Sequence, residues 1–244
     1  MMLFFSKKSF LVDHLEGLVD IHNHILPGID DGSPDLSTTI EMIRLFKEIG
    51  YKGCIATPHT MEDYYGNDTE TITLNYKDTI DQLHASENHS FIVKASSEYM
   101  MDSGFEELIE SEKILFLKDR ILLTEFSYFQ KPEYVNEVVF DMLQKDITPI
   151  LAHPERYRYI KGIEEFKDLK NRGFLFQLNL LSIQGHYGKD AQKKAMLLLE
   201  HNLYDLVGTD AHKPEHLSKI KEIQIKSNII KSIQPVIENS KLNF

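Results

Sequence analysis

Leu18-Val19-Asp20-Ile21-His22-Asn23-His24 joins a short apolar run to two histidines that stand two residues apart. Side chains two apart on a strand face the same side, so His22 and His24 are predicted to point toward a common centre. The following segment has the spacing of an amphipathic helix over about residues 36–49, with Asp35 as its N-cap. A buried strand followed by a helix is therefore the first unit of the predicted fold.

The same unit recurs along the chain. Further strands are predicted at 53–57, 91–95, 120–125, 148–152, 174–180 and 204–208. Helices are predicted at about 69–85, 105–109, 132–145, 164–171 and 190–201, with Pro132 at the first position of its helix and the chain after residue 208 helical. Seven such units predict the α/β class, with a parallel sheet closed or nearly closed into a barrel. An open doubly wound sheet is the alternative, but no Gly-x-Gly-x-x-Gly follows the first strand.

Length and charge limit the classes of function. The 244 residues fit one barrel domain over residues 1–244, with the motifs between about 18 and 212. Lys and Arg number 27 and Asp and Glu number 38, which gives a net charge of −11. This acidity argues against a general nucleic-acid binder and against attachment to an anionic membrane surface.

Neither a membrane anchor nor an internal disulfide is expected. No apolar run approaches the roughly 20 residues that cross a bilayer, and Met1–Lys8 lacks the order of charged and apolar residues found in targeting segments. The single cysteine, Cys54, lies in an apolar run and is interpreted as a small buried hydrophobe. We therefore expect a cytoplasmic protein without stable membrane insertion, whose oligomeric state the sequence leaves open.

Residues of metal-ligand type stand at six of the seven predicted strand ends. They are His22, His24, Asp30 or Asp31, His59, Glu98, Glu125, His153, Asp210 and His212. The carboxyl ends of parallel strands meet at one mouth of a barrel, so these side chains are expected to lie together. Only the sixth strand lacks such a residue, and it offers Gln177 and Asn179 instead.

A buried cluster of histidines and carboxylates is costly without cations, because like charges repel and lose hydration. Nine side chains exceed the four or five ligands of one zinc-like centre, so two or three divalent ions are implied. Imidazole and carboxylate ligands together suit Mn, Fe, Zn or Co. The other six histidines are interpreted as surface residues: His14, His84, His89, His186, His201 and His216.

Five short motifs follow one another in the chain: Asp20-Ile21-His22-Asn23-His24, Asp30-Asp31-Gly32, Thr57-Pro58-His59, His153-Pro154-Glu155-Arg156 and Gly208-Thr209-Asp210-Ala211-His212. Together they resemble the polymerase-and-histidinol-phosphatase (PHP) family, and more closely its bacterial branch of capsule-type protein-tyrosine phosphatases, the CpsB/CapC/YwqE group. Gln177–Ser182 and Gly185–Lys189 also resemble that branch. The resemblance implies a distorted (β/α)₇ TIM-like barrel, the PHP fold, that holds three divalent ions, typically manganese.

The resemblance also implies roles for single residues. His22, His24, Glu98 and Asp210 would hold one ion, Glu98 would bridge to a second ion held by Glu125 and His153, and Asp31, His59 and His212 would hold the third. Asp30 is the alternative to Asp31, and Arg156 would be the catalytic residue that binds the substrate phosphate. Members of this branch commonly carry a second arginine after Asp-Ala-His, whereas this chain has only Lys213 and Lys219 there. A lysine does not reproduce the bidentate fork of a guanidinium.

The activity that the resemblance implies is a protein-tyrosine phosphatase, acting on phosphotyrosine of a bacterial tyrosine kinase in capsule or exopolysaccharide synthesis. A hydroxide held by the metals would attack phosphorus in line, while Arg156 and the ions neutralise the equatorial oxygens. The Cys-x₅-Arg signature of thiol phosphatases is absent, because Thr60 stands where the arginine would follow Cys54. Tyr65 is a candidate to stack on the substrate ring, as are Tyr64, Tyr128 and Phe129.

Other functions use the same residues in part. A small-molecule phosphatase, such as one acting on histidinol phosphate, would apply the same metals to a smaller ester. A nuclease of the same family is disfavoured, because the chain has no basic strip for a polymer backbone. A non-catalytic metal-binding regulatory module would keep the ligands without needing Arg156. The segment from about Glu215 onward either packs on the barrel or contacts another subunit.

Overall fold

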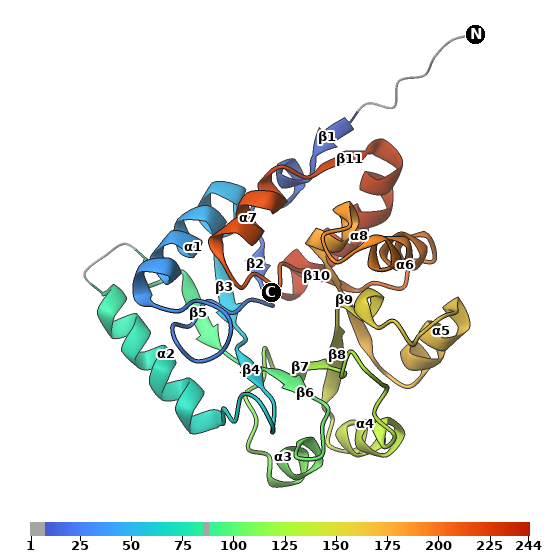
Figure 1. The fold of residues 1–244 in the computed structure, drawn as a ribbon, viewed down its shortest axis with the longest axis horizontal. Helices are drawn as coiled ribbons and strands as arrows, with labels where there is room; N and C mark the ends of the chain where they lie inside the picture. Colours follow the sequence, from blue (N-terminus) through green and yellow to red (C-terminus); the bar gives the residue numbers. More distant parts are fainter. Residues whose placement is uncertain (1–7, 85–87) are drawn as a thin grey trace.

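The computed structural model describes residues 8–84 and 88–244, in which strands and helices alternate (Figure 1). The strands are β1 (Lys8–Phe10), β2 (Val19–Asp20), β3 (Gly53–Ala56), β4 (His59–Thr60), β5 (Ile92–Ala95), β6 (Glu98–Met100), β7 (Ile121–Glu125), β8 (Thr148–Ala152), β9 (Leu175–Asn179), β10 (Leu206–Gly208) and β11 (Gln224–Lys226). The helices are α1 (Leu36–Ile49), α2 (Thr69–Leu83), α3 (Phe105–Ser111), α4 (Val135–Gln144), α5 (Ile163–Asn171), α6 (Lys189–Glu200), α7 (Pro214–Lys221) and α8 (Ser227–Asn243). Short 3₁₀ helices lie at Leu11–His14, Pro154–Arg156 and Leu180–Gln184.

Most of the strands pair in parallel. One sheet has the order β10-β9-β8-β7-β6-β4, and another has the order β2-β3-β5. Beyond the strand ends, the backbone N–H of Asp210 donates to the carbonyl of His22 (2.7 Å), and that of Ser96 donates to the carbonyl of Ala56 (2.8 Å). The chain is thus mixed α/β, with parallel strands at the centre and helices around them (Figure 1).

Helix α1 forms where the sequence predicts it. The carboxylate of Asp35 accepts the N–H of Thr38, which satisfies one of the free donors of the first turn. The helix ends at Gly50, whose φ of 100° lies in the left-handed region that glycine adopts without steric cost. Between these ends Met42 and Phe46, one turn apart, are fully buried and hold the helix against the strands.

Two hydrophobic clusters fill the molecule. The larger lies between the helices and the strands, whereas the smaller gathers inward-facing strand residues: Val19, Ile21, Ile55, Leu123, Ile150, Ala152 and Leu206, with Leu117. Phe244 at the end of the chain packs against the smaller cluster. The segment after Glu215 therefore packs on the strands of its own chain, which is the first of the two expected alternatives.

The structure corrects three predictions of elements. Helix α4 begins at Val135, so Pro132 is not its first residue; the fixed φ of proline suits the preceding loop as well as a helix start. Residues 224–226, predicted to be helical, form β11 and pair antiparallel with β1. Strands β1, β4 and β6 were not predicted, because runs of two or three residues carry no readable periodicity.

Two further predictions touch residues that the structure does not describe. Helix α2 ends at Leu83, and residue 85, the predicted end, lies outside the described residues. Residues 1–7 of the N-terminal segment also lie outside them. Within 8–84 and 88–244, no helix has both the length and the apolar composition to span a membrane.

Candidate metal centre

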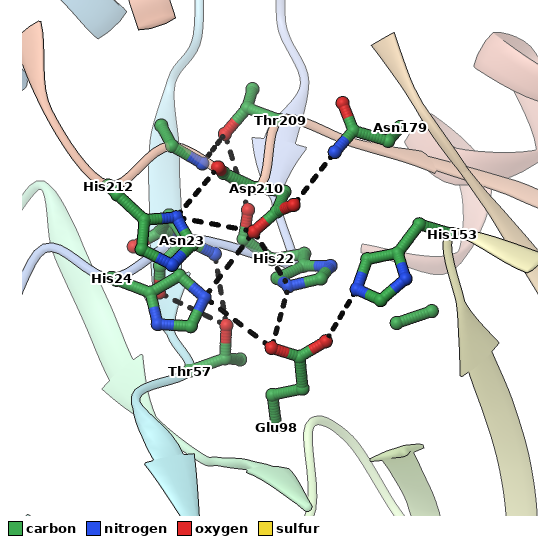
Figure 2. A network of polar contacts seen from close by, with 12 residues as sticks. His22, Asn23, His24, Thr57, Glu98, His153, Asn179, Thr209, Asp210 and His212 are labelled. Carbon is green, nitrogen blue, oxygen red and sulfur yellow. Dashed lines mark hydrogen bonds and ion pairs between the residues drawn. The ribbon is translucent and has the colours of Figure 1, made fainter. Parts of the chain in front are cut away.

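The nine predicted ligands come together at the carboxyl ends of the parallel strands. His22 and His24 follow β2, His59 opens β4, Glu98 opens β6, Glu125 ends β7, His153 follows β8, Asp210 and His212 follow β10, and Asp31 lies in the loop before α1. Figure 2 shows six of them pointing into one space. All are buried or half-buried except Asp31, whose side chain is 53% exposed. The proximity expected from the sequence is thus a feature of the structure.

The first group consists of His22, His24, Glu98 and Asp210, all of them buried. The Nε2 atom of His22 lies 3.2 Å from Glu98 Oε2 and 3.4 Å from Asp210 Oδ1. The Nε2 atom of His24 lies 3.5 Å from each of the same two oxygens. Four ligands at zinc-like bond lengths in a tetrahedron have atoms about 3.4 Å apart. The group therefore has the dimensions of a cation site.

Two further groups adjoin the first. His59 Nδ1 lies 3.1 Å from Glu125 Oε1 and 3.2 Å from Glu98 Oε2, and His153 Nε2 lies 2.9 Å from Glu98 Oε1. On the other side, Asp31 Oδ1 lies 3.5 Å from the Nε2 atoms of both His59 and His212. Glu98 thus borders both groups: its Oε2 faces His22, His24 and His59, and its Oε1 faces His153. His59 borders the second group as well as the third, which the sequence did not indicate.

Several of these atoms are buried without a hydrogen-bond partner in the described part of the chain. They are His22 Nε2, His24 Nε2, His59 Nδ1, Glu98 Oε2, His153 Nδ1 and both oxygens of Glu125. Each unsatisfied buried polar atom costs about 1–3 kcal/mol. Except for His153 Nδ1, these atoms face one another across the cluster. The imidazole nitrogens offer lone pairs, and the carboxylate oxygens add negative charge. The donor set therefore fits divalent cations.

Neighbouring side chains fix the orientation of the candidate ligands. Gln177 Oε1 lies 2.8 Å from His22 Nδ1, and Asp30 Oδ2 lies 2.7 Å from His24 Nδ1. In each ring this leaves Nε2 as the atom turned toward the cluster. Asn179 donates to Asp210 Oδ2 at 2.8 Å (Figure 2). The sixth strand, which offers no ligand, thus supplies two orienting amides, and their two-residue spacing is the signal that could have found them.

Asp30 and Asp31 have different positions. Asp30 is bonded to His24 and accepts the backbone N–H groups of Gly32 and His59, so its oxygens are already used. Asp31 is the one that faces His59 and His212. Gly32 permits this tight loop, because a Cβ there would lie 2.1 Å from the carbonyl oxygen of His24.

Two candidate ligands have strained backbones. His153 has a φ of 34° and Asp210 a φ of 51°, in the left-handed region that residues other than glycine seldom occupy. Such conformations cost about 1–3 kcal/mol each and cluster at functional sites. His153 directly follows β8 and Asp210 follows β10 after one residue, and both side chains point into the cluster.

Charges within the cluster compensate one another. Burial alone would lower the pKa of His22, but the carboxylates of Glu98 and Asp210 raise it to about 9. Burial also opposes ionisation of Glu98, yet His22 and His153 hold its pKa well below its usual range. Burial and the charge of His24 lower the pKa of His212 to about 4, so that ring is neutral at pH 7. Positive charge on His22 thus offsets the buried carboxylates of Glu98 and Asp210.

Arg156 lies at the edge of the first group. Its Nη1 atom donates to Asp210 Oδ2 at 2.6 Å. Its guanidinium carbon lies 4.2 Å from the ring centre of Tyr187 and 4.7 Å from that of Tyr128. The cation is therefore clamped between two aromatic rings. The clamp was not predicted, because Tyr187 comes from a loop 31 residues away in sequence.

A cavity of about 960 Å³ leads from the surface to these residues. Tyr64, Tyr65, Tyr128 and Phe129 line it, as the sequence suggested for aromatic residues at strand ends. The ring of Tyr65 stacks on that of His59, with centroids 5.5 Å apart and planes 12° apart.

Other predicted residues lie outside this cavity. Lys213 and Lys219 are not among its lining residues, and Lys219 Nζ instead lies 3.4 Å from His186 Nδ1. His216, interpreted as a surface residue, is half-buried, and its Nδ1 accepts the backbone N–H of His212 at 3.3 Å.

The sequence profile of the CpsB/CapC family, described as capsular polysaccharide synthesis, matches residues 18–231. The chain belongs to the CpsB/CapC family. The matched range includes all nine candidate ligands and Arg156, and the family expected from the motifs is confirmed.

CpsB/CapC relatives cover most of the chain. Tyrosine-protein phosphatase YwqE of Bacillus subtilis is 32% identical over 200 residues, which are 80% of this chain and 77% of that protein. Tyrosine-protein phosphatase CpsB of Streptococcus agalactiae serotype V is 25% identical over 80% of this chain and 83% of that protein. A crystal structure from work on YwqE of Bacillus subtilis and CpsB of Streptococcus pneumoniae, described as unique metal-dependent tyrosine phosphatases, superposes with a TM-score of 0.76 at 27% identity, covering 92% of this chain and 93% of that chain.

Proposed function

We propose that this protein is a metal-dependent protein-tyrosine phosphatase, a phosphoric monoester hydrolase that acts on phosphotyrosine of a bacterial tyrosine kinase in capsule or exopolysaccharide synthesis. The observation that carries the proposal is the set of facing ligand atoms without partners beside Arg156, at the end of an aromatic-lined cavity. The names of the relatives support the substrate class. A kinase substrate and a single unpaired cysteine suit the cytoplasm, where we place the activity.

We infer that the parallel strands close into a distorted seven-stranded barrel of one domain. The hydrogen bond from Asp210 to His22 and the parallel bridge between Asn23 and Ala211 support closure, because they join the end of β10 in one parallel sheet to the end of β2 in the other. At the other edge, β4 and β6 follow β3 and β5 after two residues each, which continues one sheet into the other. The smaller hydrophobic cluster supports it too, since its side chains fill the space that such strands would enclose. In a barrel of this kind the candidate centre lies at the mouth where active sites form.

The ligand assignment is part of the proposal. His22, His24, Glu98 and Asp210 would hold one ion; Glu98, Glu125 and His153, with His59 at the border, a second; and Asp31, His59 and His212 a third. Imidazole and carboxylate ligands without a thiolate suit Mn²⁺, with Fe, Zn and Co as alternatives. When bound, the ions would supply Lewis acidity and an activated water for attack on phosphorus.

The protein's own groups bind and orient the phosphate. The guanidinium of Arg156 offers N–H donors to phosphoryl oxygens, and its ring clamp holds it in place before substrate arrives. The hydroxyl of Tyr128 keeps its proton, because burial raises its pKa well above the usual range, and it lies 3.4 Å from His153 Nε2. It is therefore a neutral donor beside the site.

The proposed hydrolysis requires neither a strong general acid for the leaving group nor a cysteine nucleophile. A tyrosine phenolate, with a solution pKa of about 10, leaves far more readily than an alkoxide, so a strong general acid is not required. Cys54 is fully buried and its thiol pKa is raised by that burial, which excludes it as a thiolate nucleophile. The Cys54→Ser variant is accordingly expected to stay active.

A substrate comparison tests the proposal. Manganese-loaded protein should hydrolyse a phosphotyrosine peptide and p-nitrophenyl phosphate with a higher kcat/KM than histidinol phosphate, and His22→Ala and His153→Ala should lose metal and activity. Faster turnover of histidinol phosphate would favour the small-molecule phosphatase. Failure on all three substrates would favour a non-catalytic metal-binding module.

A further inference from the structure

A second cavity, of about 560 Å³, lies beside the one that leads to the candidate metal centre. The two cavities share Tyr128, Phe129 and Arg156 as lining residues. Arg158 and Tyr187 line the second cavity but not the first. Since the walls are shared, a peptide whose phosphotyrosine occupies the first cavity places a nearby residue at the second. No step of the proposed hydrolysis uses Arg158.

The second cavity is positively charged, although the protein as a whole carries −11. Two arginines line it, Arg156 and Arg158, and among the described residues Asp190 is the acidic one. Asp190 is already paired with Lys194, at 2.9 Å between Oδ2 and Nζ. That hydrogen bond, together with the charges of Lys194, Lys161 and Arg158, lowers the pKa of Asp190. Asp190 is thus engaged by Lys194 and Arg156 by Asp210, which leaves Arg158 as the cation of this cavity without a close acidic partner in the described ranges.

The two arginines differ in their availability. Arg156 is in contact with the rings of Tyr128 and Tyr187, and one of its N–H donors is used by Asp210. Arg158 is exposed, and it makes no hydrogen bond or close ion pair with any residue in the described ranges. Its full set of donors is open to a ligand.

Part of the lining of the first cavity is acidic. Asp63, Asp102 and Glu133 line the first cavity and do not line the second. Phe129, 93% exposed, lines both cavities. A negatively charged residue near the phosphotyrosine would thus be repelled by these carboxylates and attracted by Arg158.

We propose that the cavity around Arg158 binds an anionic side chain, a carboxylate or a second phosphate, on a residue near the phosphotyrosine of the same substrate. The guanidinium fork matches both anions, and the rings of Phe129 and Tyr187 contact the stem of the bound side chain. This inference rests on the proposed phosphatase function and adds sequence preference to it.

Peptide kinetics test the inference. The substrates are a phosphotyrosine peptide with alanine flanks, the same peptide with glutamate placed in turn at each of the three positions on either side, and the same series with a second phosphotyrosine. The proteins are the parent, Arg158→Ala, Arg158→Glu and, as the matched control, Arg44→Ala on the exposed face of α1. Each kcat/KM is divided by the value that the same protein gives for p-nitrophenyl phosphate, which has no flanking residues.

The parent should prefer an anionic flank at one or two positions on the same side by about threefold to fivefold, the size expected of an exposed ion pair. Arg158→Ala should abolish the preference, Arg158→Glu should reverse it, and Arg44→Ala should keep it. A preference for both glutamate and the second phosphotyrosine would show that the cavity accepts either anion. A preference for the second phosphotyrosine alone would show that it selects a phosphate.

Equal rates on all peptides in the parent, or an unchanged preference in Arg158→Ala, would overturn the inference while leaving the phosphatase intact. A parent that hydrolyses neither the peptides nor p-nitrophenyl phosphate would contradict the proposed function itself, and the inference with it.

Discussion

Glu98 is the side chain that joins the candidate centre together. Its Oε2 lies among His22, His24 and His59, and its Oε1 lies 2.9 Å from His153. An amide in its place keeps the size but removes the charge and turns one end into a donor. Glu98→Gln should therefore bind fewer ions and lose at least about 100-fold in kcat/KM. Metal content and turnover of p-nitrophenyl phosphate check this, with exposed Glu107→Gln as the control.

Near-normal metal content and turnover in Glu98→Gln would show that this carboxylate is not a shared ligand. A loss of secondary structure would instead report a folding defect, so circular dichroism of the variant belongs with the assay. The Glu107→Gln control should match the parent in every measurement, because its side chain is exposed on α3.

Tyr187 acts through Arg156. Its ring covers the guanidinium at 4.2 Å, and its hydroxyl accepts a hydrogen bond from Asn179 (3.0 Å). A buried cation–π contact contributes about 1–2 kcal/mol, so Tyr187→Leu should lower kcat/KM about fivefold to thirtyfold. Tyr187→Phe keeps the ring and should recover most of the loss. Steady-state kinetics on p-nitrophenyl phosphate distinguish the two variants, and equal losses in both would argue against the clamp.

At the scale of elements, one buried hydroxyl links α8 to β10. Ser240 Oγ accepts the N–H of Val207 (3.0 Å) and donates to the carbonyl of Val236 (2.9 Å), all in a buried setting. Ser240→Ala leaves the N–H of Val207 without an acceptor and should lower the free energy of unfolding by about 1–3 kcal/mol.

Urea unfolding of the Ser240→Ala variant measures this cost. Ser232→Ala, half-buried on the same helix, removes only a long hydrogen bond of 3.4 Å and should have a much smaller effect. Turnover should change little in either variant, because neither serine lines the cavity that leads to the candidate metal centre. Equal stability of the two variants would contradict the role given to Ser240.

The elements also show how far the sequence leads. The apolar runs that became β3, β5, β7, β8 and β9 were long enough to be recognised, and the caps of α1 were correct. Strands β1, β4, β6 and β11 have two or three residues and form through pairing with distant segments, so a local pattern cannot reveal them. The helix start predicted at Pro132 was wrong, because a proline fits a loop as well as a first helical turn.

The site divides in the same way. His22, His24, Glu98 and the other candidate ligands follow strands, and parallel strands must bring their ends together, so their proximity could be predicted. Gln177, Asn179 and Asp30 contact the candidate ligands through hydrogen bonds. These bonds depend on how neighbouring strands and loops are positioned in three dimensions, so the sequence could not predict them. The ring of Tyr187 reaches Arg156 only because its loop, 31 residues away in sequence, lies beside Arg156 in the fold. A local sequence pattern cannot reveal such a contact.

At the scale of the whole molecule, protons and metal ions would compete for the proposed ligands. Without metal, the pKa of His22 is raised from 6.5 to about 9, so its contribution to stability is full below pH 6.5 and is lost as the pH rises through 9. Metal binding needs the deprotonated ring and therefore strengthens with pH.

The pH dependence should accordingly have opposite signs in the two forms. Between pH 6 and pH 9, the contribution of His22 to the free energy of unfolding of the metal-free protein should fall. Over the same range, the stability added by a fixed concentration of Mn²⁺ should grow. Urea unfolding at the two pH values, with and without metal, measures both. A metal-induced stabilisation that is equal at pH 6 and pH 9 would contradict histidine ligation.

The central claim is that the facing histidines and carboxylates hold the ions that make this chain a phosphatase. Titration of metal-free protein with Mn²⁺, followed by turnover of p-nitrophenyl phosphate, tests it most directly. The account predicts no turnover in the metal-free protein and full turnover when about three ions are bound per chain. Turnover that persists in the metal-free protein, or that is not restored by any of Mn²⁺, Fe²⁺, Zn²⁺ and Co²⁺, would contradict it.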